Sequence, residues 1–384
     1  MTVIADYRTY AVISPVAGAA SNDDRVDVIW KDGRSSAYHC LWLRDNCPCA
    51  ECVYGVTREQ VFEIADVPFD LKASVVTVTA DGNLAVIWED GHASHYHAGW
   101  LRAHAYDDRS LAEQAASQPK AKHWNATLQV PTFDYPDLMN DDGALLRWLL
   151  ALRDTGLSLV NGMPLQPGSL AAVARRISFI RESNFGVLFD VQSRPDADSN
   201  AYTAFNLPLH SDLPTRELQP GLQFLHCLVN DAVGGSSTFV DGFEIARTLR
   251  REDPQAFAML SQTPVEFRNK GRTTDYRCRA PVIAVDEHGE VTEIRMANFL
   301  RGPFSTSVDR MLPLYRAYRR FIEMTREDRF RFRQRLEAGQ MWCFDNRRAL
   351  HARDAFDPTT GKRHFQGCYV DRDELLSRIG VLQR

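Results

Sequence analysis

Short stretches in which apolar and polar residues alternate recur along this chain, and Asp-Gly pairs separate several of them. Near the N-terminus, alternating runs at 26–30, 75–79 and 84–88 are each followed by an Asp-Gly pair within three residues. Alternation with a period of two is typical of half-buried β-strands, and Asp-Gly favours tight hairpin turns. The sequence therefore predicts a small antiparallel β domain over residues 1–105.

The remainder of the chain divides into a polar connector and a second, larger domain. Residues 106–130 are polar and rich in Ala, Gln and Lys, which predicts a connector that is helical in part. Residues 131–384 contain more short β runs, at 222–228, 237–240, 282–285 and 341–344. Many short strands with few helices are typical of a barrel or a jelly roll. We therefore predict a fold that is mainly β with helices, of the α+β class.

Residues 311–337 have a helical pattern inside this β-rich region. Apolar residues recur there at helical spacing, and eight arginines lie between Arg316 and Arg335. We interpret this segment as a long helix with one face in the core and a solvated basic face. The alternative is that the arginines form a patch for an anion or a partner protein.

Composition excludes several classes of protein. The 384 residues are 44% hydrophobic and 25% charged, which is ordinary for a globular chain and excludes a mostly disordered one. The net charge of −5 argues against a broad nucleic-acid-binding surface, and the absence of long apolar runs argues against a membrane span. Asp6 and Arg8 would interrupt a signal peptide, so we expect a cytoplasmic protein.

Three cysteines lie close together in the predicted N-terminal domain. Cys47, Cys49 and Cys52 fall within six residues, and without a signal peptide a metal site is a better interpretation than disulfides. Thiolates at this spacing can hold one side of a tetrahedral Zn²⁺ ion, and a histidine would complete a closed structural site. The candidates for that fourth ligand are His39, His92, His95 and His97. We favour His92, because the Asp90-Gly91 turn would present it at a hairpin tip; unliganded cysteines are the alternative.

A second group of metal-binding residue types lies in the predicted jelly roll. His210 and Asp212 are two residues apart, so in an extended segment their side chains point to the same side. His351 ends an apolar, strand-like run farther along the chain. Two histidines and one carboxylate leave positions open on the metal for a co-substrate and O₂, which suits non-haem Fe(II). The His-x-Asp motif alone is weak, because a histidine near an aspartate is common on protein surfaces.

Residues downstream of each motif strengthen the iron interpretation. Arg363 follows His351 by twelve residues, and a guanidinium near the metal can bind the distal carboxylate of a keto-diacid through two hydrogen bonds. Ser237 could add a hydroxyl to that carboxylate. The order His-x-Asp, His, Arg in a chain of short strands is the arrangement of 2-oxoglutarate-dependent Fe(II) oxygenases.

The sequence resembles one family within these oxygenases over essentially its whole length. The strings that carry the resemblance are long: Leu41-Trp42-Leu43-Arg44-Asp45-Asn46-Cys47, Asp90-Gly91-His92, Asn200-Ala201-Tyr202-Thr203, His210-Ser211-Asp212, the run at 220–227, Val240-Asp241-Gly242-Phe243 and Phe344-Asp345-Asn346-Arg347-Arg348. The family is that of the γ-butyrobetaine dioxygenases, and the chain is more similar to the bacterial members.

The resemblance implies a fold and a set of ligands. It implies an N-terminal zinc domain at 1–105 and, at 131–384, a double-stranded β-helix that binds Fe(II) and 2-oxoglutarate. The residues that match the family's zinc ligands are Cys47, Cys49, Cys52 and His92, and those that match its iron ligands are His210, Asp212 and His351. Arg363 matches the residue that grips 2-oxoglutarate, and we assign Leu225 to the same co-substrate site. A homodimer and possible use of ascorbate are further expectations.

The resemblance also implies how the substrate is held. A trimethylammonium group carries no N–H, so aromatic faces are its suitable partners. Four aromatic residues match the family's cage: Phe185, Phe189, Tyr202 and Tyr369. The two phenylalanines replace the Tyr and Trp of the animal enzymes; being four residues apart, they would share a face of a helical turn. Asn298 matches a residue that holds the substrate carboxylate, and Asn200 is a second candidate.

The function that follows is hydroxylation of γ-butyrobetaine at C3 to L-carnitine, coupled to oxidative decarboxylation of 2-oxoglutarate. Trimethyllysine is the nearest alternative substrate, because it carries the same cationic head group and the cage cannot separate the two. A non-catalytic adaptor, whose zinc module docks a partner, is the alternative of a different class. The complete set of His210, Asp212, His351 and Arg363 argues against the adaptor.

Overall fold

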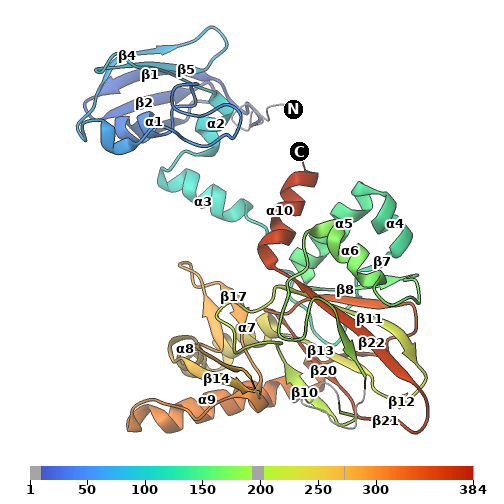
Figure 1. Ribbon diagram of the computed structural model, residues 1–384. Coiled ribbons are helices and arrows are strands. Elements are labelled where there is room, and N and C mark those ends of the chain that lie inside the picture. The colour runs from blue at the N-terminus through green and yellow to red at the C-terminus, as the bar shows by residue number, and fades with distance from the viewer. Residues whose placement is uncertain (1–9, 193–202, 272, 384) are drawn as a thin grey trace. The chain divides into compact units, whose positions relative to one another are not determined.

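A computed structural model describes residues 10–192, 203–271 and 273–383 of the chain (Figure 1). The chain forms two compact units, Met1–Pro119 and Lys120–Arg384. Each unit has a hydrophobic core of its own.

The N-terminal unit consists of two three-stranded antiparallel sheets, β1-β2-β3 and β4-β5-β6. Its elements are β1 (Val16–Asn22), β2 (Arg25–Trp30), β3 (Ser35–His39), α1 (Cys40–Asp45), β4 (Ala73–Val78), β5 (Leu84–Trp88), β6 (Ala93–Tyr96), α2 (Ala98–Ala103) and α3 (Asp108–Ser117). The predicted Asp-Gly pairs connect β2 to β3, β4 to β5 and β5 to β6, with a positive φ at each glycine. Alternate residues of the strands form the core, among them Trp30 and Trp88, which are about 1% exposed.

The segment predicted as a connector is divided between the two units. Helix α3 begins after Asp107, whose carboxylate accepts a hydrogen bond from the Ser110 amide, and it belongs to the first unit. The following residues are bonded into the second unit: the Trp124 amide donates to Asp241 and its indole donates to the Thr155 carbonyl.

The second unit is built on two sheets. One has six strands in the order β7-β8-β19-β11-β22-β9, and the other has four in the order β10-β20-β13-β18. These strands are β7 (Thr132–Asp134), β8 (Leu157–Asn161), β9 (Phe189–Val191), β10 (Leu207–His210), β11 (Leu222–Asn230), β13 (Ser237–Asp241), β18 (Phe332–Gln334), β19 (Met341–Asp345), β20 (Ala349–Arg353) and β22 (Arg363–Val370). Strands β12 (Val233–Gly234) and β21 (Phe356–Asp357) form a separate, two-stranded antiparallel sheet (Figure 1).

The two sheets share one hydrophobic core. Phe344 and Phe365 of the larger sheet pack in the same cluster as Phe239 and Ala349 of the smaller one. The other face of the larger sheet is covered by helices: Phe224 of β11 packs with residues of α4 (Tyr135–Asn140), α5 (Asp142–Thr155), α6 (Ser169–Ile177) and α10 (Arg372–Leu382). This arrangement confirms the predicted jelly roll, the double-stranded β-helix.

A further layer packs on the outer face of the four-stranded sheet. It contains α7 (Gly242–Glu252), α8 (Pro254–Gln262), α9 (Val308–Arg326) and the hairpins β14 (Val265–Lys270)–β15 (Asp275–Ala280) and β16 (Ile283–Val285)–β17 (Val291–Ile294). The expectation of one helix over 311–337 was wrong at its C-terminal end: the helix ends at Arg326, and 332–334 form strand β18. Phe332 on β18 packs against the core between the two sheets, which overrides the local helical pattern. In the described parts of the chain, no helix has the length and apolarity required to cross a membrane.

Candidate functional site

Three polar side chains meet at the smaller sheet of the jelly roll. His210 at the end of β10 is paired across the sheet with His351 of β20, and their ring centroids are 4.2 Å apart. The Asp212 carboxylate lies 3.1 Å from Nε2 of His210 and 3.7 Å from Nε2 of His351. The structure therefore brings together the three residues predicted to bind iron.

The chemistry of this group fits a divalent metal. Nδ1 of His210 lies 2.9 Å from the Pro208 carbonyl, so if that nitrogen carries the proton, Nε2 keeps its lone pair. Burial lowers the pKa of His351 to about 3, which keeps this imidazole uncharged. For Asp212, burial raises the pKa, but the hydrogen bond with His210 and the neighbouring groups outweigh it, so the pKa is below its usual range. Two imidazoles and a carboxylate are the donor set of a 2-His-1-carboxylate site.

Asn346 holds the backbone on which Asp212 lies. Its side-chain oxygen accepts from the Asp212 amide at 2.6 Å, and its amide group donates to the carbonyls of Asp212 and Pro220 at 3.0 and 3.2 Å. Leu213, the residue after Asp212, has a φ of 51°, which is unusual for a leucine. Because Asn346 is fully buried, it fixes this strained turn and with it the direction of the Asp212 carboxylate.

Three aromatic rings gather beside Asp212 and form an aromatic cluster. Phe189 lies 5.1 Å from Tyr369 and 6.0 Å from Phe185, measured between ring centroids. The Tyr369 hydroxyl donates to the second oxygen of Asp212 at 2.6 Å, so the aromatic cluster is joined to the candidate iron site. Leu213 and Leu225 pack against these rings. Tyr202 and Asn200, which were predicted to contribute, lie outside the described residues.

The structure corrects the reason given for the pairing of Phe185 and Phe189. They do not share a helical turn: Phe189 begins β9, and Phe185 lies in the turn that precedes it. Gly186, between them, has a φ of 90°, which a right-handed helix does not allow. The rings meet because β9 pairs with β22, where Gly367 lies opposite Phe189. A Cβ at Gly367 would be 2.4 Å from that ring, so glycine is required there.

Arg363 is a buried cation at the start of β22. It is 9% exposed, and its Nε and Nη1 atoms have no hydrogen-bond partner among the described residues. Burial, with a contribution from the charge of Arg353, lowers the pKa of Arg363 to about 9. Both guanidiniums lie about 5 Å from the ring of Phe356 (5.0 and 5.1 Å). Such a concentration of buried positive charge with unused donors fits a bound carboxylate.

Ser237 and Asn298 occupy different surroundings. Ser237 is buried on β13 and pairs across the sheet with Arg353 of β20, close to the arginine pair. Asn298 is exposed in a short 3₁₀ turn and lines a cavity against α9. The ring of the next residue, Phe299, lies 5.3 Å from that of His210, measured between centroids.

The cysteines of the N-terminal unit surround one histidine. Nε2 of His92 lies 3.3, 3.5 and 3.6 Å from the sulfurs of Cys47, Cys49 and Cys52. Zn–S and Zn–N bonds of ordinary length at a tetrahedral angle would place these atoms about 3.6 Å apart. His39 instead bonds to the Tyr106 hydroxyl at 3.0 Å, and the four atoms of the Cys–His group lie within 4.8 Å of one another. The residues therefore fit a tetrahedral zinc ion.

Arg44 supports this Cys–His group from one side. Its Nη1 donates to the Cys52 sulfur at 3.2 Å, and its Nε lies 3.6 Å from the Asp90 carboxylate. The guanidinium also lies 4.0 Å from the centroid of the Phe62 ring. A cation beside thiolates offsets the negative charge that three of them would bring to one metal ion.

Comparisons with known proteins agree with these arrangements. The family described as "Taurine catabolism dioxygenase TauD, TfdA family" matches residues 114–369, and "Gamma-butyrobetaine hydroxylase-like, N-terminal" matches residues 19–102. Gamma-butyrobetaine dioxygenase of Pseudomonas sp. (strain AK-1) is 68% identical over 381 residues, covering 99% of this chain and 100% of that protein. The human gamma-butyrobetaine dioxygenase is 31% identical, with 94% of each chain covered.

This chain belongs to the γ-butyrobetaine dioxygenase family. Trimethyllysine dioxygenases are more distant relatives: that of Meyerozyma guilliermondii is 26% identical with 94% of each chain covered. The family assignment confirms the resemblance inferred from the sequence, and it identifies the chain as a dioxygenase of the Fe(II)/2-oxoglutarate class.

Three residues that shape the site of this member of the γ-butyrobetaine dioxygenase family were not recognised from the sequence. They are Asn346, which holds the Asp212 turn, Arg353, which lies beside Arg363, and Gly367, which admits the Phe189 ring. Asn346 and Arg353 had a weak signal, because both are polar residues within five positions of His351. Gly367 had none, because its requirement comes from a strand that pairs with it across the sheet.

Proposed function

We propose that this enzyme hydroxylates γ-butyrobetaine at C3 to give L-carnitine, with 2-oxoglutarate and O₂ as co-substrates. The observation that carries the proposal is the buried group of His210, Asp212 and His351 with an aromatic cluster joined to it through Tyr369. The family relationship supports the same activity, since the 68% identical relative is named gamma-butyrobetaine dioxygenase.

His210, Asp212 and His351 are the proposed ligands of Fe(II). Iron at this site would supply activation of O₂, driven by oxidative decarboxylation of 2-oxoglutarate to succinate and CO₂. The Tyr369 hydroxyl and Asn346 would keep one carboxylate oxygen of Asp212 directed at the metal, because they bind its other oxygen and its backbone. The burial of both imidazoles excludes bulk water from this side of the site.

Arg363 is the proposed partner of the distal carboxylate of 2-oxoglutarate. Ser237 and Leu225 are proposed neighbours of that ligand, one as a hydroxyl donor and the other as an apolar wall. The support for this role is the buried guanidinium, whose Nε and Nη1 atoms make no hydrogen bond among the described residues.

Replacing Arg363 with methionine is expected to raise the KM for 2-oxoglutarate selectively. Hydrogen bonds to charged groups contribute about 1.5–3 kcal/mol, so the increase should be roughly ten- to a hundredfold. The KM for γ-butyrobetaine should change less than about twofold, because the aromatic cluster is untouched. Steady-state succinate formation measures both constants; equal increases in the two would contradict the assignment of Arg363 to the co-substrate.

Phe185, Phe189 and Tyr369 are the proposed binding site for the trimethylammonium group, with Tyr202 as a fourth member. Replacing Phe189 with leucine keeps the site apolar but removes an aromatic face. A desolvated cation–π contact is worth up to about 2 kcal/mol, so the KM for γ-butyrobetaine should rise by up to about thirtyfold.

Two comparisons separate this effect from a loss of packing. Phe179→Leu, at a ring that is 68% exposed, is the matched control and should leave the KM unchanged. The second comparison uses 5,5-dimethylhexanoate, in which carbon replaces the quaternary nitrogen, as an inhibitor. If Phe189→Leu weakens binding of this analogue, whose head group is uncharged, as much as binding of the substrate, the ring contributes packing only and the cation–π role is rejected.

Asn298 remains the proposed partner of the substrate carboxylate, with Asn200 as the second candidate. In the N-terminal unit, Cys47, Cys49, Cys52 and His92 are the proposed ligands of a structural Zn²⁺ ion. A homodimer, a cytoplasmic location and a use of ascorbate stay predictions.

The decisive experiment measures succinate formed from 2-oxoglutarate with Fe(II), with and without γ-butyrobetaine. We expect substrate-dependent succinate and an equal amount of L-carnitine. Trimethyllysine in place of γ-butyrobetaine should give a much lower rate; a faster rate would assign the enzyme to that substrate. Succinate formation that neither substrate stimulates would overturn the proposal and favour the adaptor alternative.

A further inference from the structure

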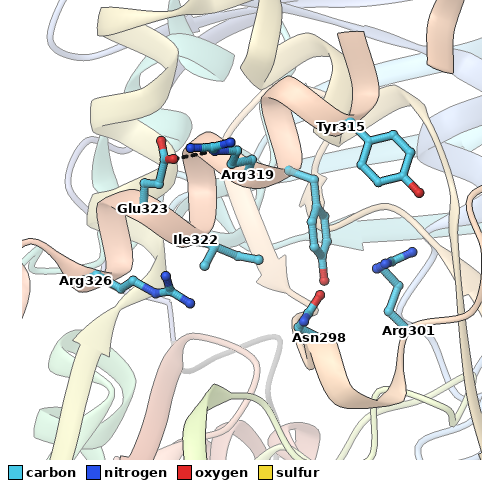
Figure 2. A pocket seen from close by; sticks show the side chains of 8 residues that line it. Asn298, Arg301, Tyr315, Arg319, Ile322, Glu323 and Arg326 are labelled. Carbon is cyan, nitrogen blue, oxygen red and sulfur yellow. Dashed lines mark hydrogen bonds and ion pairs between the residues drawn. The ribbon is translucent and has the colours of Figure 1, made fainter. Parts of the chain in front are cut away.

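A cavity of about 340 Å³ lies between helix α9 and the 3₁₀ turn at Asn298–Leu300 (Figure 2). Its polar lining consists mainly of Asn298 and Arg301 on one side and Tyr318, Arg319, Glu323 and Arg326 of α9 on the other. Figure 2 shows the side chains of Asn298, Arg301 and Arg326 directed into the space between the turn and the helix. The cavity therefore uses part of the arginine-rich segment that was noted in the sequence.

Two polar groups at this cavity are buried and unused. Tyr318 is 4% exposed, and its hydroxyl lies near the Arg301 guanidinium, a donor, but meets no acceptor among the described residues. Nε of Arg301 is likewise buried without a partner, although the same guanidinium donates to the Gly302 carbonyl at 2.7 Å. Burial raises the pKa of Tyr318 above its usual range, so the hydroxyl stays protonated and can donate. A buried donor without an acceptor is costly, which indicates that an acceptor is missing.

The charges at the cavity are unbalanced. Arg319 pairs with Glu323 at 2.6 Å, so these two charges neutralise each other (dashed in Figure 2). Arg301 and Arg326 form no ion pair with an acidic residue within the described ranges, which leaves positive charge at the cavity. Positive charge combined with a hydroxyl and an amide donor is the complement of an oxyanion.

A residue that lines the cavity is also a sequence neighbour of a residue that contacts the candidate active site. Asn298 lines it, and the next residue, Phe299, places its ring 5.3 Å from the ring of His210. The aromatic cluster contacts the iron site through Asp212, by the Tyr369 hydroxyl. Phe299 therefore connects the turn that lines the cavity to one residue of the metal site, and Tyr369 connects the aromatic cluster to another.

We propose that this cavity is an oxyanion site that binds a carboxylate group, with Arg301 and Arg326 as cations and Tyr318 as the buried donor. The carboxylate has two possible sources: the far end of a substrate molecule held over the iron site, or a free small carboxylate. The first source rests on the proposed function, and the second does not.

The test uses acetate as the probe on the full-length, Fe(II)-loaded enzyme under anaerobic conditions, with saturating 2-oxoglutarate to occupy the Arg363 site. Calorimetric titration should show acetate binding to the wild type. Tyr318→Phe, which keeps the ring, and Arg326→Gln should each weaken binding by about three- to tenfold, the effect of one hydrogen bond or exposed charge. Arg316→Gln removes an exposed arginine of the same helix that does not line the cavity, and should leave binding unchanged.

Saturating γ-butyrobetaine distinguishes the two sources. If the substrate carboxylate occupies the cavity, γ-butyrobetaine displaces acetate, and Tyr318→Phe and Arg326→Gln raise its KM several-fold. The same variants then leave binding of propyltrimethylammonium, which lacks a carboxylate, unchanged. If a free carboxylate is the ligand, acetate binds together with γ-butyrobetaine and the KM stays as in the wild type.

Acetate that fails to bind the wild type, or that binds all three variants equally, would overturn the oxyanion site. That outcome is separate from a failure of the proposed function, which would appear as wild-type enzyme that makes no L-carnitine. Acetate binding that depends on Tyr318 and Arg326 in such an inactive protein would leave the oxyanion site standing with a free carboxylate as its ligand.

Discussion

Asp212→Ala is expected to abolish L-carnitine formation and to lower the iron content of the protein. The change removes the only carboxylate among the proposed iron ligands, and it also leaves the Tyr369 hydroxyl without its acceptor, whereas the hydrogen bonds of Asn346 to the backbone of residue 212 remain. Groups that merely support metal ligands are worth about 10- to 100-fold, so loss of a ligand should cost more than about a hundredfold in turnover. Metal analysis and succinate formation measure the two effects.

Zinc content provides an internal check on this prediction. Asp212 and the Cys–His group belong to different compact units, so the variant should retain about one zinc ion per chain. Asp275→Asn, at an exposed ion pair on the β14–β15 hairpin, is the control and should keep both iron and turnover. Loss of zinc in Asp212→Ala would mean that the two metal sites had been assigned to the wrong residues.

Cys47→Ser is expected to release zinc and to unfold the N-terminal unit. Structural zinc contributes about 10–16 kcal/mol to the folding of small domains, and net stabilities of whole domains are about 5–15 kcal/mol. The unit of Met1–Pro119 should therefore lose cooperative unfolding, whether the metal is lost by mutation or by chelation. Calorimetry with and without a chelator, with zinc analysis, measures this.

His92 and His95 make a matched pair for the same site. His92→Gln should behave like Cys47→Ser, because its Nε2 faces all three sulfurs. His95→Gln, on the exposed side of β6 in the same unit, should retain zinc and the unfolding transition. A domain that stays folded and cooperative after complete removal of zinc would contradict a structural role for the metal.

Local patterns predicted those parts of the molecule whose determinants are neighbours in sequence. The Asp-Gly hairpins formed as expected, because the turn and the alternation of the strands act within a few residues. Helix α5 ends at Thr155, and Gly156 after it has the left-handed conformation that is typical of a glycine at a helix end. The cysteine cluster and the His-x-Asp pair could likewise be recognised because their side chains converge over two to five residues.

Features that depend on pairing between distant strands could not be read in this way. The contact of Phe185 with Phe189 was expected from helical spacing, whereas it arises from a turn and from the pairing of β9 with β22. The C-terminal end of the 311–337 segment has a helical pattern, yet it adds a strand to the four-stranded sheet. In both cases tertiary packing outweighs a weak local preference.

The sequence by itself determined the residue types of both metal groups, the β character of both units and the membership of a dioxygenase family. Only the tertiary structure decided that the pairing of β10 with β20 brings His210 opposite His351. It also decided that the guanidiniums of Arg353 and Arg363 both lie against the Phe356 ring, and that Asn298 lines an arginine-rich cavity. The physical reason is that metal ligation chemistry belongs to the side chains. Their distances are instead set by sheet register, which depends on contacts between residues far apart in the chain.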